Sequence, residues 1–397
     1  MRQRWLALLT LQTAAVQVVW VGARVLAGLV AVEQGAGVAA LGVLAATTAF
    51  PALLGAVPAG RACDRFGGGA VAVLGIVVLL VGTTLIATAP DLPRLLAGAA
   101  VTGAGSLLAM VGQQAVVAAR SAAGDRTGHF SLVTTAASLG QLVAPLAVTG
   151  GLGAVAAAGT GQGLVACGIA GVVGLVAAGV AVRSAPRPTR APRAADGTRA
   201  GLPAHRLVRL PQFWRSLSTS AAVLVTVDLM YTMLPLWAAE RDVAAGTLGL
   251  LLALRAAVSV LSRVALGRIV DRLGVRPVLA GALVTGVLAL VLLALGPTAA
   301  GWPAMVLLGV ALGAPQPLTM SWTVGLVPPG VQGAALGVRL WANRAGQVSV
   351  PLVAGAVLAP AGFLGFALLN AALLAGAAVV VGTARFPDGR FPDWPTP

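Results

Sequence analysis

The sequence predicts an all-α membrane protein of about twelve transmembrane helices, built as two pseudo-symmetric six-helix bundles. Three observations predict this fold class: the apolar composition, the long apolar runs and a short motif that occurs twice. Hydrophobic residues make up 58% of the 397 residues and charged residues only 9%, whereas a soluble domain carries about a quarter charged residues. A water-soluble fold of this size could not keep so few charges on its surface, so a lipid bilayer is the expected solvent.

Long apolar runs follow one another along the chain. A membrane-spanning helix needs about 20 predominantly apolar residues, and about twelve such runs occur. Their approximate limits are 6–31, 38–58, 70–89, 93–118, 129–152, 160–182, 214–238, 245–266, 277–296, 302–327, 333–358 and 362–384. The 52 glycines suit close contact between helices in lipid, where small residues let backbones approach. The sequence lacks the alternating segments of about ten residues that a membrane β-barrel requires.

The arginines predict the orientation of the chain. They gather before the first run and after the second, fourth, sixth, eighth and twelfth runs, while the alternate loops carry few of them. The positive-inside rule therefore predicts a multi-pass protein of the cell (inner) membrane with both termini in the cytoplasm. The stretch 184–212 is rich in Pro and Arg, which is typical of a cytoplasmic linker, here between an N-terminal bundle (1–183) and a C-terminal bundle (213–397).

Two short patterns occur at equivalent places in both halves. Residues 60–67 read GRACDRFG and residues 267–274 read GRIVDRLG, so five of eight positions are identical at an offset of 267 − 60 = 207. A Gly-Gln pair followed by proline stands at 140–145 and again at 346–351, at an offset of 346 − 140 = 206. Two patterns at nearly one offset indicate a duplicated six-helix unit.

These residues resemble the major facilitator superfamily. The pattern G-x-x-x-D-R-x-G between the second and third helices is similar to the signature loop of that family, whose second half commonly keeps a copy. The stretch from Arg94 to Gly98 resembles the family's R-x-x-x-G motif. Gly140, Pro145 and the glycines at 150–151 are similar to the Gly–Pro motif of antiporters, although Ala144 stands where glycine precedes the proline.

The resemblance implies transport by alternating access, in which two helical bundles rock around a central site near the bilayer midplane. The repeated motif is then interpreted as a cytoplasmic latch. Its glycines allow a tight turn between helices, its aspartate faces the positive end of a neighbouring helix, and a nearby arginine holds that aspartate. The alternative is a solvated turn whose charges follow only the positive-inside rule. The expected latch residues are Gly60, Asp64, Arg65, Gly67, Gly267, Asp271, Arg272 and Gly274.

Polar and ionisable residues inside apolar runs are the candidate binding residues, because a charge at the bilayer centre is costly. Trp20 stands four residues before Arg24, and Tyr231 three residues after Asp228, so each pair shares a helix face. In the family, the helices that carry the intramembrane charges line the central cavity or stand beside it. The expected substrate-binding residues are Trp20, Arg24, Gln141, Tyr231, Arg255, Gln316, Arg344 and Gln347.

Asp228 is the expected proton-coupling residue, and Arg94 is grouped with it. Burial favours the protonated form of a carboxyl group and a nearby arginine favours the ionised form, so a substrate that competes for the arginine would change proton binding. The alternative is that Asp228 forms a structural ion pair with one arginine. For Gln141 and Gln347, the alternative is hydrogen bonding between helices.

The sequence predicts a transporter and no enzyme. It has no phosphate-binding loop for ATP, no cluster of metal ligands and no motif for a cofactor. It also lacks a basic face with interleaved aromatic residues, so nucleic acid is not an expected partner. The expected partners are a small-molecule substrate, protons and the lipid bilayer, and the expected assembly is a monomer.

Three functions stay open at this stage. The leading interpretation is a secondary active transporter, coupled to protons, that exports a small organic molecule or drug, because the Gly–Pro motif is typical of antiporters. The second is an uptake carrier for an organic anion such as a carboxylate, which the intramembrane arginines favour. The third, of another class, is a membrane sensor that transports nothing.

Overall fold

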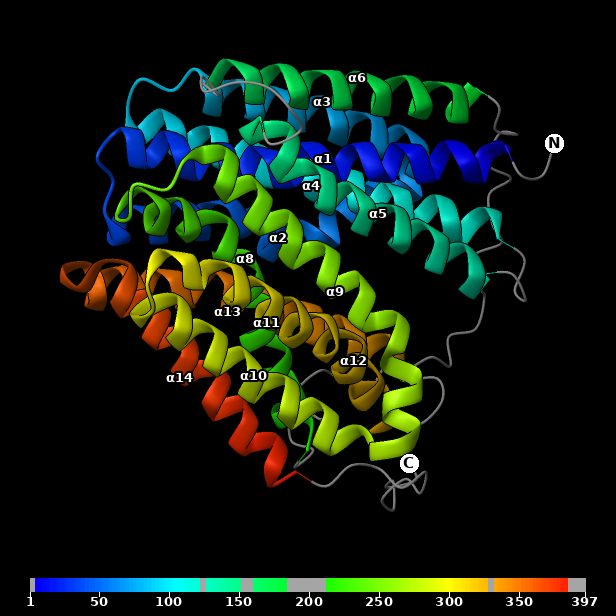
Figure 1. Ribbon diagram of the computed structural model, residues 1–397. Helices are drawn as coiled ribbons and strands as arrows, with labels where there is room; N and C mark the ends of the chain where they lie inside the picture. Colours follow the sequence, from blue (N-terminus) through cyan, green and yellow to red (C-terminus); the bar gives the residue numbers. More distant parts are fainter. Residues whose placement is uncertain (1–3, 122–125, 151–159, 184–211, 328–331, 385–397) are drawn as a thin grey trace. The chain divides into compact units, whose positions relative to one another are not determined.

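The computed structural model describes residues 4–121, 126–150, 160–183, 212–327 and 332–384. Within these ranges the chain is helical and contains no strand (Figure 1). The predicted linker lies outside the described residues except for Gln212, as do Gly151 of the Gly–Pro motif and both ends of the chain.

The helices follow the predicted apolar runs. In the N-terminal half they are α1 (Arg4–Glu33), α2 (Val38–Phe66), α3 (Gly68–Ala87), α4 (Leu92–Arg120), α5 (Arg126–Thr149) and α6 (Thr160–Arg183). In the C-terminal half they are α8 (Phe213–Ala239), α9 (Ala245–Leu273), α10 (Val275–Leu295), α11 (Gly301–Gly313), α12 (Pro315–Gly325), α13 (Gln332–Leu358) and α14 (Gly362–Gly382). In lipid, each backbone polar group needs a partner within the chain, and a helix supplies one.

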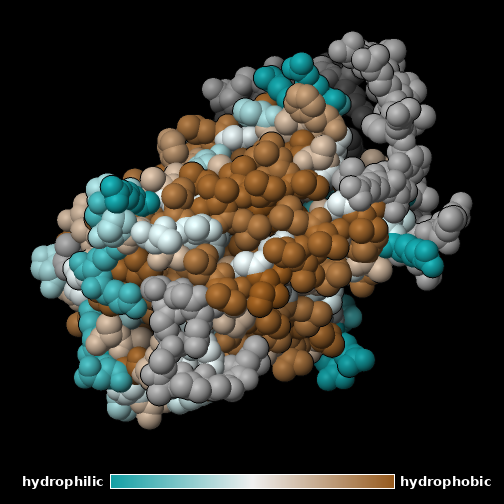
Figure 2. Space-filling view, turned by 90° about the horizontal axis from the view of Figure 1, so that it is seen from above, coloured by the Kyte–Doolittle hydropathy of each residue, from teal (hydrophilic) through white to brown (hydrophobic). Residues whose placement is uncertain are grey.

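Eleven segments of the described residues are long and apolar enough to cross a membrane. One of them, Thr298–Gly325, contains both α11 and α12. The helix α13 is present at the predicted place but is not among the eleven, because Arg339, Asn343, Arg344 and Gln347 lower its hydropathy. Apolar residues gather over the middle of the face in Figure 2, with hydrophilic residues toward its edges. The prediction of an all-α, multi-pass membrane protein is therefore confirmed.

The described residues fall into two compact units. The first takes in those within Met1–Ala191, Met230–Ala256 and Pro351–Ala359; the second takes in those within Pro192–Leu229, Ala257–Val350 and Pro360–Pro397. In the first unit α3 lies beside α4 and α6, and in the second α10 lies beside α14 (Figure 1). The first unit thus joins the N-terminal helices to the ends of α8, α9 and α13. The bundle boundaries at 183 and 213 stay a prediction.

Glycines set the closest helix contacts of the first unit. A Cβ atom on Gly75 or Gly82 of α3 would overlap the backbone of Ala109 or Thr102 on α4. A Cβ on Gly112 of α4 would likewise meet the backbone of α3. Small residues at helix crossings allow this backbone approach in lipid.

The repeated motif corrects one part of the latch prediction. Residues 60–67 were expected to form a turn that starts at Gly60, but α2 continues to Phe66, so Gly60, Asp64 and Arg65 are helical. Only Gly67 leaves the helix, with φ 87° and ψ 142°, while its N–H donates to the carbonyl of Cys63 at 2.9 Å. The C-terminal copy has the same form: α9 continues to Leu273, and Gly274 has φ 85°. The helix persists because its last turn keeps its backbone hydrogen bonds, and one glycine suffices for the turn.

We expect Gly67→Ala to lower the free energy of unfolding by about 1–3 kcal/mol, because an L side chain rarely adopts a positive φ of this kind. The matched control is Gly60→Ala, where the backbone is helical and a Cβ would meet nothing within 4 Å. That control should be neutral or stabilising by up to about 1 kcal/mol. Thermal unfolding in detergent measures both, and equal effects of the two variants would contradict the assignment of the turn to Gly67 alone.

Candidate functional site

The first unit contains a buried group of two arginines around one tyrosine. The guanidinium carbon of Arg24 on α1 lies 5.3 Å from the ring centroid of Tyr231 on α8, and that of Arg255 on α9 lies 5.0 Å from the same centroid. Arg24 also lies 5.3 Å from the ring centroid of Trp20, one turn earlier on α1. Cations within about 6 Å of an aromatic ring are attracted by its negative face. We call these four residues the arginine–tyrosine group.

Arg255 is the cation of this group with the fewest partners. It is 3% exposed, and one terminal guanidinium nitrogen donates a hydrogen bond to the hydroxyl of Tyr231 at 2.5 Å. Its Nε has no hydrogen-bond partner among the described residues, and no described carboxylate pairs with it. A buried guanidinium stays charged and needs compensation. The position therefore suits a ligand with a negatively charged or electron-rich group.

The second unit contains a chain of three polar side chains between α8 and α13. Arg344 donates to Oε1 of Gln347 at 2.9 Å, and Nε2 of Gln347 donates to the Oδ2 atom of Asp228. Gln347 is 3% exposed, while Asp228 and Arg344 are half-buried. The amide of Gln347 thus links a cation to a carboxylate. We call this the Asp228 chain.

The repeated Gly-Gln pair has the same structural role in both halves. A Cβ on Gly140 of α5 would overlap the carbonyl of Ala14 on α1, and Gln141 donates to Gln17 on α1 at 3.2 Å. In the C-terminal copy, a Cβ on Gly346 would lie 3.3 Å from the Cβ of Ala221 and 3.4 Å from a methyl carbon of Val225, both on α8. Gln347 donates to Asp228 on the same helix. Each pair therefore joins the fifth membrane segment of its half to the first, where α11 and α12 count as one segment.

Two helix crossings in the first unit were not predicted from the sequence. A Cβ on Gly42 of α2 would overlap the carbonyl oxygen of Pro351 on α13. A Cβ on Gly249 of α9 would lie 3.0 Å from the carbonyl oxygen of Pro145 on α5. The two glycines are related by 249 − 42 = 207, the offset of the repeated motif. That offset was the signal that could have found them.

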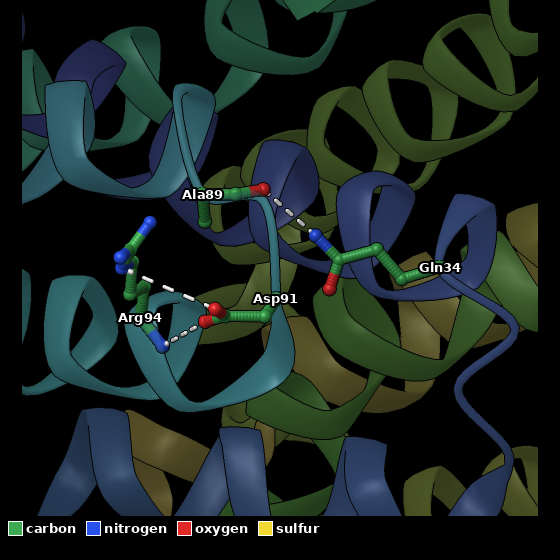
Figure 3. Close-up of polar contacts among 4 residues, drawn as sticks. All are labelled: Gln34, Ala89, Asp91 and Arg94. Atoms are coloured by element: carbon green, nitrogen blue, oxygen red, sulfur yellow. Dashed lines mark hydrogen bonds and ion pairs between the residues drawn. The ribbon is translucent and has the colours of Figure 1, made fainter.

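The remaining predicted residues lie elsewhere. Arg94 is exposed in the first turn of α4. Its backbone N–H donates to Oδ1 of Asp91 at 2.9 Å, and its side-chain Nε lies 4.0 Å from Oδ2 of Asp91 (Figure 3). In the same view Gln34 donates to the carbonyl of Ala89 at 2.8 Å. This position favours a role for Arg94 at the helix terminus. The side chain of Gln316 is exposed, and the backbone carbonyl of Gln316 accepts from Arg339 at 3.3 Å and from the hydroxyl of Thr319 at 3.2 Å.

The latch aspartates are exposed. Neither Asp64 nor Asp271 makes an ion pair or a side-chain hydrogen bond with any residue that the structure describes. Arg65 lies over the ring of the adjacent Phe66, 5.1 Å from its centroid. The latch role of both copies stays a prediction.

Comparison with known proteins places this arrangement in a family. The sequence profile described as Major Facilitator Superfamily matches residues 9–243 and 226–397, which together span nearly the whole chain. The chain belongs to the Major Facilitator Superfamily. The resemblance drawn from residues 60–67 and 267–274 is therefore confirmed, and membership indicates a membrane transporter rather than an enzyme.

Solved transporters of this fold are similar over almost their full length. The nucleoside transporter NupG matches with a TM-score of 0.77 and 14% identity, covering 96% of this chain and 100% of that one. A D-xylose–proton symporter matches with a TM-score of 0.75 and 14% identity, covering 96% and 98%. A bacterial homolog of the human lysosomal transporter Spinster matches with a TM-score of 0.72 and 16% identity, covering 96% and 95%. No curated protein sequence matches. At these identities the likeness shows the superfamily fold and leaves the substrate open.

Proposed function

We propose that this transporter is a proton-coupled secondary carrier that exports a small organic molecule, and that the molecule bears an acidic group. The observation that carries the proposal is the arginine–tyrosine group, above all the buried Arg255. Its unused Nε–H donor and uncompensated charge favour a carboxylate or similar anion. The rings of Trp20 and Tyr231 favour an organic body next to that anion, because aromatic side chains pack well against apolar and cationic groups.

Proton coupling rests on the Asp228 chain. In its ionised form Asp228 only accepts hydrogen bonds, which matches the donated bond from Gln347. Protonation removes the negative charge that compensates Arg344 through that amide. The proton thus changes the balance of charge in the second unit, and this change is the proposed link between proton binding and the state of the carrier.

The two glycine crossings are the proposed external gate. The arginine distribution predicts that the ends of α1, α2, α5, α8, α9 and α13 near these crossings face the outside. Close packing there seals that side, while the latch residues at the cytoplasmic ends stay exposed. Opening and closing of the crossings then exposes the binding site to each side of the membrane in turn. The same proposal places the protein in the inner membrane with both termini in the cytoplasm.

We expect Arg255→Gln to weaken binding of acidic ligands by about 10-fold or more, because a hydrogen bond to a charged group contributes about 1.5–3 kcal/mol. The ligands come from a thermal-shift screen of the purified protein against organic acids and neutral drugs, since ligand binding raises the stability of the folded state. Neutral hits should keep their affinity. The matched control is Arg276→Gln, an exposed arginine on α10. Equal binding of acidic ligands by wild type and Arg255→Gln would contradict the proposed site.

The second candidate is uptake of an organic anion by proton symport. The pair of buried arginines around Tyr231 favours an anion without fixing the direction of transport. The Gly–Pro motif at 140–145 supports export, since it is similar to that of antiporters, with the departure at Ala144. The sign of proton movement separates the two: as solute enters liposomes, antiport raises the internal pH and symport lowers it.

A further inference from the structure

The helix break between α11 and α12 leaves one backbone carbonyl without its helical partner, and an arginine satisfies it. Pro317 has no N–H, so the carbonyl of Gly313 lacks its usual helical partner four residues later. The Nε–H of Arg263 on α9 donates to that carbonyl at 3.1 Å. Arg339 on α13 donates at 3.3 Å to the backbone carbonyl of Gln316, which lies within the first turn of α12. The start of α12 therefore lies among cationic side chains.

Arg339 is a buried cation without a carboxylate partner in the part of the chain that the structure describes. It is 5% exposed. Its terminal nitrogen also donates to the hydroxyl of Thr319 at 3.1 Å, so both of its contacts are to neutral oxygens on α12. Its Nε has no hydrogen-bond partner among the described residues. An uncompensated charge in such a place is expensive, and a guanidinium does not deprotonate to relieve it.

Asn343 stands one turn after Arg339 on the same face of α13. It is 2% exposed, and neither its Nδ2 nor its Oδ1 has a hydrogen-bond partner among the described residues. Buried polar side-chain atoms are bonded in the large majority of cases, so two such atoms in one residue indicate a missing partner. Arg339 and Asn343 thus bring unused N–H donors together beside the first turns of α12.

We propose that Arg339 and Asn343 form a binding site for one monovalent anion, either a halide ion or the carboxylate end of a small acid. The anion accepts from Nε of Arg339 and Nδ2 of Asn343 and balances the guanidinium charge. A water molecule could pair with the amide of Asn343, its Oδ1 included, but would leave the guanidinium charge of Arg339 uncompensated, which is why an anion is favoured beside Arg339. The positive end of α12 adds to the same attraction.

This site differs from the arginine–tyrosine group in residues and helices. It belongs to the second unit, on α12 and α13, whereas Tyr231 and Arg255 belong to the first. Its existence does not depend on which solute is carried or in which direction. Failure of the transport proposal would leave it standing, and the reverse also holds.

The test is the thermal stability of the full-length protein in detergent, measured at constant ionic strength made up with the sulfonate isethionate, which is neither a halide nor a carboxylate. Chloride and formate are titrated in separate arms. We expect a saturable rise of the unfolding midpoint by about 2–4 °C in at least one arm. Chloride alone assigns a halide site, and formate alone assigns a carboxylate site. Arg276→Gln, the exposed control, should keep the rise.

Two variants address the site itself. Arg339→Gln should lose the saturable rise. Asn343→Asp carries its own negative charge next to Arg339, so it should be at least as stable as wild type in isethionate alone and insensitive to both anions. The proposal is overturned if wild type shows no saturable response, or if either variant responds as wild type does. The wild-type titration and Asn343→Asp keep the test decisive should Arg339→Gln fold poorly.

Discussion

Gly42→Ala is expected to reduce transport strongly while the protein still reaches the membrane. The new Cβ overlaps the carbonyl oxygen of Pro351, so α2 and α13 can no longer pack as they do in the first unit. Overpacking of this kind costs about 1–3 kcal/mol, which corresponds to a decrease of about 5- to 150-fold in the population of the closed gate. Uptake of the screened ligand into proteoliposomes measures the effect.

The matched control lies on α6, and a second test variant lies on α9. A Cβ on Gly179 of α6 meets nothing within 4 Å, so Gly179→Ala should transport as wild type does. Gly249 lies at the duplicated crossing, where a Cβ would also overlap the hydroxyl of Thr149. Gly249→Ala should therefore reduce transport as Gly42→Ala does. Normal transport by both Gly42→Ala and Gly249→Ala would show that the crossings are ordinary packing and no gate.

Asp228→Asn is expected to abolish transport driven by a pH gradient. The amide has nearly the shape of the protonated carboxyl group but binds no proton at neutral pH, so the proposed coupling step is removed. Exchange of ligand across the membrane without a pH gradient should continue, because the arginine–tyrosine group is unchanged. Accumulation of labelled ligand with and without an imposed pH gradient measures both properties.

The behaviour of Asp228→Asn distinguishes a proton-coupling role of Asp228 from a purely structural role. If Asp228 were only a structural partner of Gln347, the variant would lower stability and leave the pH dependence of the remaining transport as in wild type. An Asp228→Asn protein that accumulates ligand with an unchanged pH dependence would refute the coupling role.

The helices could be predicted from the sequence because each transmembrane helix corresponds to a continuous apolar run. Their ends were harder to predict where charged residues continue a helix beyond the bilayer, as Asp64 and Arg65 do on α2. The turn at Gly67 depends on the positive φ of that one residue. The sequence contains many glycines and does not show which of them adopts such a φ. The broken helix at 301–325 was predicted as a single run, since Pro315 and Pro317 lie within an apolar stretch.

The candidate site was predicted residue by residue but not as a set of contacts. Arg24, Tyr231 and Arg255 were each chosen for their polarity inside an apolar run, and the structure brings them together. Their association could not be read from periodicity, because helices that are apolar on all sides give no signal for the inward face. Arg339 and Asn343 also lie in an apolar run, but only the structure shows that both side chains are buried beside α12.

The most direct test of the central claim uses liposomes that contain the purified protein and a pH-sensitive dye. A ligand from the thermal-shift screen is added outside, and solute entry and internal pH are followed together. The account predicts that wild type moves solute and protons in a fixed ratio, with the internal pH rising, and that Asp228→Asn moves no protons. Solute entry without any proton movement in wild type, or proton movement by Asp228→Asn equal to that of wild type, would contradict it.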